Sequence, residues 1–332
     1  MAIHTLEADT SNLHGGFNPA LKPVLTIAPG DTVRYRTLAA GWQLEPARHD
    51  GGEIAIVAAR PGIPNDGHAL IGPVAIRGAL PGMTLVIRID RMVPGAWGTV
   101  YSGGWDMVVN HRFGISEEHH RYFTNWELAW NTSTSTGTGR SEEGIELRLY
   151  PFFGVIGMPP PEPGWHPTDP PRRGGGNIDC AELVAGSTLY LPIELAGGLV
   201  SVGDGHALQA DGEASGTAIE CPMELGELTI DLLPDQPLPN PWAETPAGTI
   251  TFGFDEDLNE AMLQALEGMV RLLKQRHGLE TQAALALCSL VVDLRITQVV
   301  NGVKGVHALL KPDALKRTIT GNDIPATTNP SS

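Results

Sequence analysis

The stretch Thr84-Leu-Val-Ile-Arg-Ile-Asp90 decides the fold class of this chain. Leu85, Ile87 and Ile89 stand at every second position, so they share one face of an extended strand, whereas Arg88 marks the other face. Alternation of apolar and polar residues at period two is typical of a β-strand with one buried face. The stretch therefore predicts a strand of a sheet-rich fold.

Turn-forming residues separate many short apolar runs on both sides of this strand. The 332 residues include 40 glycines and 27 prolines, a density that suits short strands joined by turns better than a helical bundle. The pattern continues from Val24 to about Phe254. We therefore predict a mainly β protein whose β-rich body spans residues 20–254.

Two segments inside this body lack a strand pattern. Residues 102–144 show no strong periodicity and carry several histidines and tryptophans, and we interpret them as a long insertion. Residues 159–176 contain seven prolines, which exclude regular helix and remove hydrogen-bond donors from any sheet. Because long loops inside a domain are often functional, both are predicted loop insertions of interest.

The pattern becomes helical after Asp255. Apolar residues recur at helical spacing up to Leu273, Asp255 is the expected N-cap, and Gly278 is the expected end. A second helix is predicted over about residues 281–292. We expect a helical addition at 255–292 that packs on the sheet, and a closing strand and tail at 293–332 that turns at Asn301-Gly302, all within one domain of residues 1–332.

Charge and hydropathy exclude several classes of partner. Lysine and arginine number 22 against 38 acids, which gives a net charge of −16. A negative field repels nucleic-acid backbones and anionic lipids, so neither nucleic acid nor membrane is an expected partner. Residues 1–16 lack the apolar core of a signal peptide, and the apolar run at 283–292 is about half of the roughly 18 residues that a membrane span needs. We expect a soluble, cytoplasmic protein.

The densest polar region lies within residues 174–220. Asp204 and His206 are two residues apart, so extended backbone would direct both side chains to one face, and the same holds for Asp211 and Glu213. A carboxylate and an imidazole on one face, with an open position for water, suit a hydrolytic metal site. The spacing therefore favours metal ligation.

Glycines in this region allow two interpretations. The triple glycine at 174–176 would form a turn that presents Asn177 and Asp179 to a ligand. The Asp-Gly pairs at 204–205 and 211–212 are, however, also the commonest hairpin-turn residues, so these acids could serve in turns alone. No complete zinc motif such as His-Glu-x-x-His is present, and both interpretations stay open.

Other sources of catalysis receive less support. The sequence has no Gly-x-Ser-x-Gly elbow and no glycine-rich phosphate loop. Cys180, Cys221 and Cys288 are widely spaced, so neither a disulfide framework nor a cysteine zinc cluster is indicated, and we interpret them as small buried residues. The remaining histidines of interest are interpreted as structural or solvated: His49, His111, His119 and His120.

A series of short motifs extends along nearly the whole chain: Pro29-Gly-Asp-Thr-Val33, Gly72-Pro-Val74, Gly78-Ala-Leu-Pro-Gly-Met-Thr-Leu85, Pro151-Phe-Phe-Gly-Val-Ile-Gly157, Gly175-Gly-Asn-Ile-Asp179, Gly203-Asp-Gly-His206, Asp211-Gly-Glu213 and Asp293-Leu294 to Gln298-Val-Val-Asn301. In their composition and order, these motifs resemble the acetamidase/formamidase family. Met83 stands where the family usually has an aspartate.

The resemblance implies a fold and an activity. It implies a CUB-like β-sandwich with added helices, hydrolysis of short linear amides such as formamide or acetamide to a carboxylate and ammonia, a homo-oligomer, and a divalent metal. Zinc is the metal we expect, with calcium as the alternative. Two other functions stay open: a non-catalytic β-sandwich that binds a small molecule, and an amidase for a lactam or a larger amide.

These observations lead to a hypothesis for the site. Asp179, Asp204 and His206 would hold the metal, and Glu213 with Glu220 would move protons between water and the departing amine, which leaves poorly until it is protonated. The polar side chains beside them would bind the amide substrate: Asn177 and Asp211.

Overall fold

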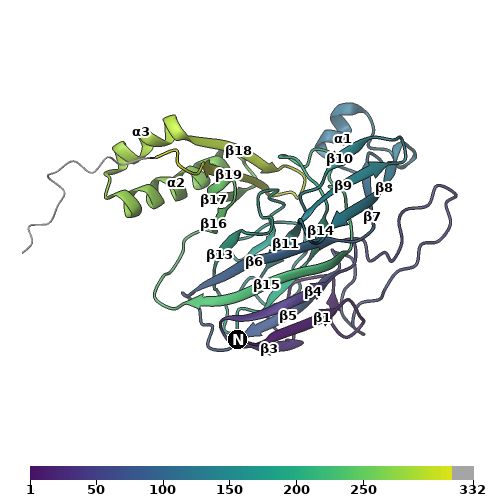
Figure 1. The fold of residues 1–332 in the computed structure, drawn as a ribbon, viewed down its shortest axis with the longest axis horizontal. Coiled ribbons are helices and arrows are strands. Elements are labelled where there is room, and N and C mark those ends of the chain that lie inside the picture. Colours follow the sequence, from purple (N-terminus) through teal and green to yellow (C-terminus); the bar gives the residue numbers. More distant parts are fainter. Residues whose placement is uncertain (316–332) are drawn as a thin grey trace, which may run out of the picture.

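Strands dominate the computed structural model, which describes residues 1–315; residues 316–332 of the predicted tail lie outside the described residues. The largest sheet has nine strands (Figure 1). In spatial order they are β1 (Ile3–Glu7), β4 (Asp31–Arg36), β15 (Met223–Leu233), β6 (Thr84–Pro94), β13 (Thr188–Pro192), β16 (Trp242–Thr245), β17 (Gly248–Asp255), β19 (Lys304–Leu310) and β18 (Val292–Gln298). The mainly β fold class is confirmed.

A second, six-stranded sheet contributes the opposite side of the core. Its strands include β11 between β12 and β14, both antiparallel to it. The full set comprises β12 (Gly175–Asn177), β11 (Phe152–Gly157), β14 (Val200–His206), β5 (Leu70–Ile76), β2 (Leu13–His14) and, parallel to β5, β3 (Leu25–Ile27).

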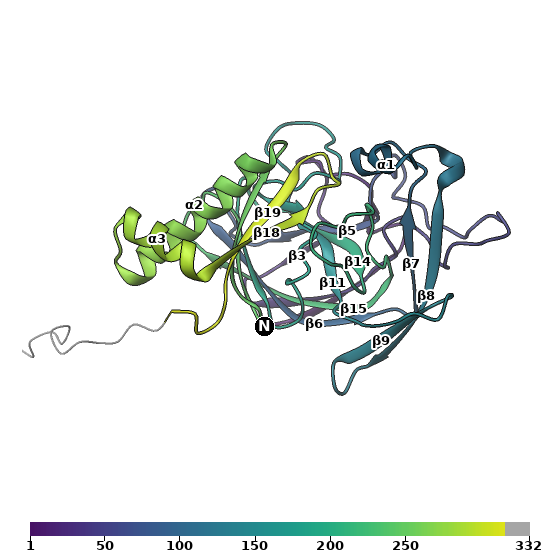
Figure 2. The same ribbon diagram turned by 90° about the horizontal axis from the view of Figure 1, so that it is seen from above.

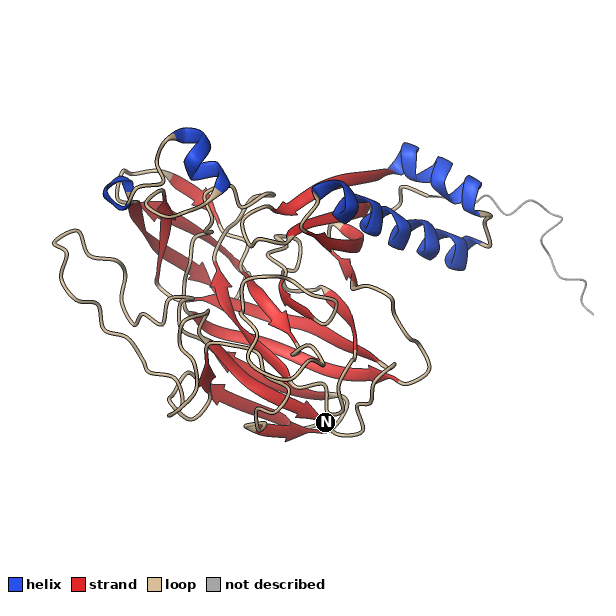
Figure 3. Cartoon of the chain, turned by 180° about the vertical axis from the view of Figure 1, so that it is seen from behind, coloured by secondary structure: helices blue, strands red, loops and turns tan. Residues whose placement is uncertain are grey.

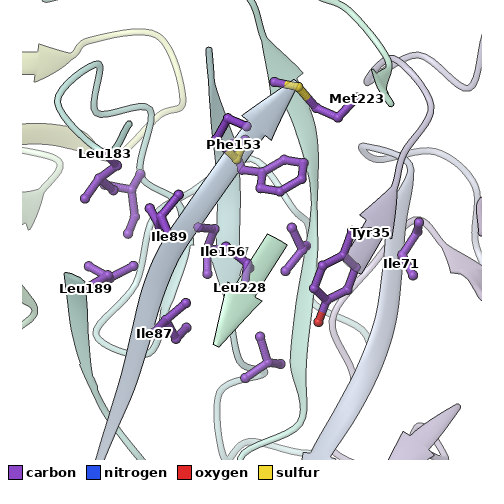
Figure 4. Close-up of a cluster of buried hydrophobic side chains, with 14 of the residues drawn as sticks. Tyr35, Ile71, Ile87, Ile89, Phe153, Ile156, Leu183, Leu189, Met223 and Leu228 are labelled. Carbon is purple, nitrogen blue, oxygen red and sulfur yellow. The ribbon is translucent and has the colours of Figure 1, made fainter. Parts of the chain in front are cut away.

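The core lies between these two sheets. Ile87 and Ile89 of β6 point into one cluster with Phe153 and Ile156 of β11 (Figure 4). Each of these four side chains is at most 1% exposed, whereas Arg88 is exposed. The period-two prediction for β6 is therefore confirmed, because its apolar face is the one that the second sheet covers.

The interpretation of residues 102–144 as an unpatterned insertion is wrong in part. It contains α1 (Val108–Phe113), the short 3-10 helix η1 (Glu118–His120), β8 (Tyr122–Asn131) and β9 (Thr136–Ser141), and the last two join β7 (Trp97–Ser102) and β10 (Glu146–Arg148) in a four-stranded sheet. The alternation of β8 was missed because its buried face includes the polar Thr124 beside Trp126 and Leu128. The predicted loop at 159–176 is confirmed over residues 159–174, which form no strand, as their prolines predict. Its predicted end is wrong, because Gly175 and Gly176 belong to β12.

The C-terminal helices pack at the end of the nine-stranded sheet, away from β8 and β9 (Figures 2 and 3). Helix α2 (Leu258–His277) begins at Asp257, whose side chain accepts the Asn259 N–H, so the expected N-cap at Asp255 is wrong by two residues. Helix α3 (Thr281–Val291) runs directly into β18. Among the described residues, no helix combines the length and apolarity that crossing a membrane requires. The assignment of residues 1–332 to one domain stays a prediction.

Candidate metal centre

Strand β14 carries two of the predicted ligands. Asp204 and His206 lie inside this strand, so the alternative in which Asp204-Gly205 forms a hairpin turn is wrong. Asp204 has φ 58°, a left-handed conformation, and not the plain extended backbone assumed from the spacing. The strand pairs with β11, so that Gly154 lies between the partners of Gly203 and Gly205 and faces Asp204.

His206 lies at the centre of a group of buried carboxylates. Its Nε2 is 3.2 Å from Asp204 Oδ1 and 3.3 Å from Glu220 Oε1, and its Nδ1 is 3.9 Å from Asp179 Oδ1. The imidazole stacks edge-on against Phe152, with ring centroids 5.0 Å apart. Apolar packing on one side and the two carboxylates near Nε2 hold the imidazole in place, whereas Nδ1 has no hydrogen-bond partner among the described residues.

Asp179 follows β12 and is held by segments far away in sequence. Its Oδ2 accepts a 2.6 Å hydrogen bond from Asn301 Nδ2, in the loop between β18 and β19, and its backbone carbonyl accepts one from Gln209. Asp179 also has a positive φ of 50°. The strained turn and these two donors aim Oδ1 at His206.

Glu213 and Glu220 complete the group, which we call the acid–histidine cluster: Asp179, Asp204, His206, Glu213 and Glu220. Backbone bridges join Glu220 to both Thr99 and His206, which explains how it reaches the imidazole. Its Oε1 also accepts the Ala218 N–H at 2.8 Å. Glu213 lies in the turn after Asp211-Gly212 with φ 46° and is 7% exposed.

Gly154 leaves room for this cluster. A Cβ at this position would lie 2.5 Å from Asp179 Oδ1 and closer still to Asp204 Oδ2. Among the described residues, Asp179 Oδ1, Glu213 Oε2 and Glu220 Oε2 are buried without a hydrogen-bond partner. Buried polar atoms without partners are costly, so the cluster is suited to a cation.

The electrostatics of the cluster agree with this conclusion. Burial, and next the charge of Asp204, raises the pKa of Asp179 to about 7. Burial followed by the Asp179 charge raises the pKa of Glu213 well above its ordinary value. Burial opposes the charge on His206, but Asp204 and Glu220 outweigh it and raise the His206 pKa well above 6.5. The four carboxylates of the cluster therefore have only the one imidazole of His206 within the cluster to balance their negative charge.

The donor atoms fit a metal ion. The three predicted ligands Asp179, Asp204 and His206 offer atoms within 4.8 Å of one another, and so do His206, Glu213 and Glu220. Carboxylate and imidazole donors are the usual ligands of zinc, whereas calcium prefers oxygen alone. The structure therefore brings together the predicted ligands and both predicted proton carriers; which of them bind metal stays a prediction.

The two predicted substrate-binding residues differ in placement. Asn177 is 2% exposed on β12, and its Oδ1 has no partner among the described residues. Asp211 forms an ion pair with Arg295, so its role in substrate binding stays a prediction. The histidines interpreted as structural lie on the surface; His49 pairs there with Glu142, and His111 with Asp106.

Sequence reasoning missed His68. Its Nδ1 is 2.6 Å from Thr168 Oγ1. Burial opposes its charge, but Asp204 and three further carboxylates outweigh burial and raise the His68 pKa. This histidine therefore interacts with the acid–histidine cluster. The sequence signal that could have pointed to His68 was its position shortly before the family-like Gly72-Pro73 motif of β5.

By its fold and its side chains, this protein is a β-sandwich that buries several carboxylates around one imidazole, a group of donors that could hold a metal ion. The model of the Acetamidase/Formamidase family matches residues 3–163 and 166–242. The chain belongs to this family, as its motifs indicated.

Solved structures and curated relatives that resemble this chain carry names from the same family. An acetamidase from Bacillus halodurans is 25% identical, with a TM-score of 0.79 over 92% of this chain and 97% of that one. A protein described as a predicted acetamidase/formamidase from Thermoanaerobacter tengcongensis is 24% identical, with a TM-score of 0.79 over 94% and 96%. A Schizosaccharomyces pombe protein, named provisionally as a formamidase, is 25% identical over 260 residues, 61% of this chain and 60% of that protein. The chain spans less than two thirds of the length of the curated relatives it matches.

Proposed function

We propose that this protein hydrolyses the C–N bond of a short linear amide, formamide or acetamide, to a carboxylate and ammonia. The observation that supports the proposal is the acid–histidine cluster, in which three buried carboxylate oxygens have no hydrogen-bond partner among the described residues and Gly154 leaves space beside the carboxylates. Family membership supports the same reaction class.

Asp179, Asp204 and His206 are the residues we propose as ligands of a divalent metal, zinc in the first place. A bound divalent ion of this kind lowers the pKa of water toward neutrality and polarises a carbonyl oxygen. Asn301 keeps Asp179 in position, and Phe152 keeps the His206 ring in position.

Glu213 is the proposed proton carrier. Because burial raises the pKa of Glu213, its carboxyl can take up a proton at Oε2 from water and return it to the departing nitrogen. Glu220 assists as a second carboxylate beside His206: its Oε1 accepts the Ala218 N–H, and its Oε2 has no hydrogen-bond partner among the described residues. Asn177 Oδ1 could accept an N–H of the substrate, which is a donor that every primary amide carries.

A thiol mechanism receives no support from the geometry. Burial raises the pKa of Cys221 above its ordinary value, and burial followed by Glu182 does the same for Cys180. Both sulfurs are therefore protonated and poor nucleophiles at neutral pH.

Ammonia release from formamide and acetamide, measured together with metal content, tests the proposal. We expect turnover by the purified protein, its loss on chelation, and its return when zinc is added. A folded, metal-loaded protein that releases no ammonia from either amide would contradict the proposal and favour the non-catalytic binding protein. Full activity after complete metal removal would contradict the metal-dependent mechanism.

A further inference from the structure

A second group of possible metal-ligand side chains begins at Cys180, the residue that follows Asp179. Cys180 and Glu182 follow β12, and His307 lies on β19 of the neighbouring sheet. The side chains of Cys180 and His307 are fully buried, and that of Glu182 is 9% exposed. Their donor atoms lie within 4.8 Å of one another. None of the three belongs to the acid–histidine cluster.

The distances resemble those of a tetrahedral site. Cys180 Sγ is 3.4 Å from Glu182 Oε2, and His307 Nε2 is 3.7 Å from the same oxygen. With ordinary zinc bond lengths to sulfur, nitrogen and oxygen, tetrahedral geometry separates such donors by roughly 3.4–3.6 Å. These two separations therefore fit one shared ion, and the donor atoms of Cys180 and His307 lie within 4.8 Å of each other.

The imidazole of His307 is oriented as a ligand. Its Nδ1 is 2.8 Å from Thr297 Oγ1, whereas Nε2, which faces the thiol and carboxylate, has no hydrogen-bond partner among the described residues. A gap of 3.7 Å to Glu182 is too long for a hydrogen bond. Burial lowers the pKa of His307 to about 4, so the ring is neutral, as a ligand must be.

The surrounding charges balance a divalent ion. Arg295 pairs with Glu182 and with Asp211. With a protonated thiol, the two carboxylates outnumber the guanidinium by one negative charge. Replacing the thiol proton by a divalent ion gives two positive charges from metal, one from Arg295, and three negative charges from the thiolate, Glu182 and Asp211. The group then becomes neutral, which the burial of Cys180, Glu182 and His307 favours.

We propose that Cys180, Glu182 and His307 form a second metal site that takes a thiophilic divalent ion such as zinc. The ion would tie the segment after β12, which carries Asp179, to β19. The loop between β18 and β19 provides Asn301, so the second site would hold the two partners of the Asn301–Asp179 hydrogen bond together. Its function is structural, and the observations that support it do not depend on the reaction proposed above.

Cobalt substitution tests the second site without an activity assay. The full chain is stripped with a chelator, loaded with Co²⁺ alone and followed in the near ultraviolet, where a cobalt–thiolate bond gives a charge-transfer band. Ligands of the acid–histidine cluster contain no sulfur, so cobalt there gives no such band. We expect the band in the wild type and, on zinc loading, about two metal ions per chain.

The variants Cys180→Ser and His307→Ala should lose this band and bind about one ion per chain. The control is Cys221→Ser, because Cys221 is equally buried but belongs to none of the ligand groups found among residues 1–315. It should keep the band. Absence of the band from folded, cobalt-loaded wild type would overturn the proposal even if the variants failed to fold. A band that survives Cys180→Ser and disappears in Cys221→Ser would overturn it as well.

Discussion

Two buried histidines in the same sheet have opposite surroundings. His14 on β2 and His206 on β14 are each 1% exposed. Around His14 the partners are neutral: Nδ1 is 2.7 Å from the Gly16 carbonyl, and Nε2 is 2.9 Å from Ser201 Oγ. Around His206 they are carboxylates.

The difference shows what turns a buried histidine into part of a functional site. Burial lowers the pKa of His14 to about 4, whereas the carboxylates outweigh burial and raise the pKa of His206. A neutral, fully paired ring stabilises the fold. A ring among acids with partnerless oxygens requires a further ligand, and the predictions below test this distinction.

Replacing His206 by alanine should have the largest effect. The change removes the only imidazole of the acid–histidine cluster, and we expect activity to fall about a thousandfold or more, beyond the 10–100-fold typical of a group that only supports a ligand. Ammonia release and metal content are measured on folded protein. His119→Ala, on the surface, is the control and should keep full activity. Near-normal turnover of His206→Ala would contradict the site.

Glu213→Gln separates proton transfer from metal binding. Glutamine keeps the shape but cannot take up a proton, so activity should fall by about 10²–10⁴-fold while metal content stays unchanged. Metal analysis alongside the ammonia assay distinguishes the two roles. If the variant lost its metal, Glu213 would be a metal ligand, which would contradict its assignment as the proton carrier.

Gly154→Ala tests the importance of the space that Gly154 leaves beside the carboxylates of Asp179 and Asp204. The added methyl group would collide with the carboxylates of Asp179 and Asp204, so we expect loss of metal and about a hundredfold loss of activity. Gly174→Ala is the matched control, because a methyl group added there would have its nearest heavy atom 3.5 Å away and the φ of Gly174 is not positive. Equal behaviour of the two variants would show that the space at Gly154 is unimportant.

Asn301→Ala should have a smaller effect on the same cluster. It removes the hydrogen bond that orients Asp179, and loss of such a supporting partner typically costs 10–100-fold in metal affinity or activity. The metal dissociation constant, measured by competition with a chelator, should rise by that factor. An unchanged constant would show that Asp179 needs no support from the β18–β19 loop.

His14→Asn should leave activity at neutral pH unchanged and alter only the pH dependence of stability. The unfolded chain binds a proton at His14 near pH 6.5, whereas the folded chain does so only near pH 4, so its contribution is complete above about pH 6.5 and is lost as the pH falls toward 4. This decrease in the free energy of unfolding is at most about 3 kcal/mol. Denaturant unfolding at pH 7 and pH 5 should show a smaller difference in the variant. An unchanged difference would contradict the assigned pKa.

Prediction from the sequence succeeded where local pattern and burial coincide. The alternation in β6 and the helical spacing of α2 are visible because each element buries one face only. Prediction failed for β8, whose buried face includes Thr124, and for the start of α2, where Asp255 and Asp257 are both good N-caps and only the backbone geometry distinguishes them.

The sequence by itself determined the class of the fold, the family and the segments that carry the site, because periodicity, turn residues and motif order are local properties of the chain. Only the tertiary structure decided how these segments meet. Asn301 reaches Asp179 across 122 residues, and Glu220 reaches His206 through an isolated backbone bridge at the end of β14. The pKa of a carboxylate, the partnerless oxygens and the space at Gly154 depend on distance and burial, which arise when distant strands pack together.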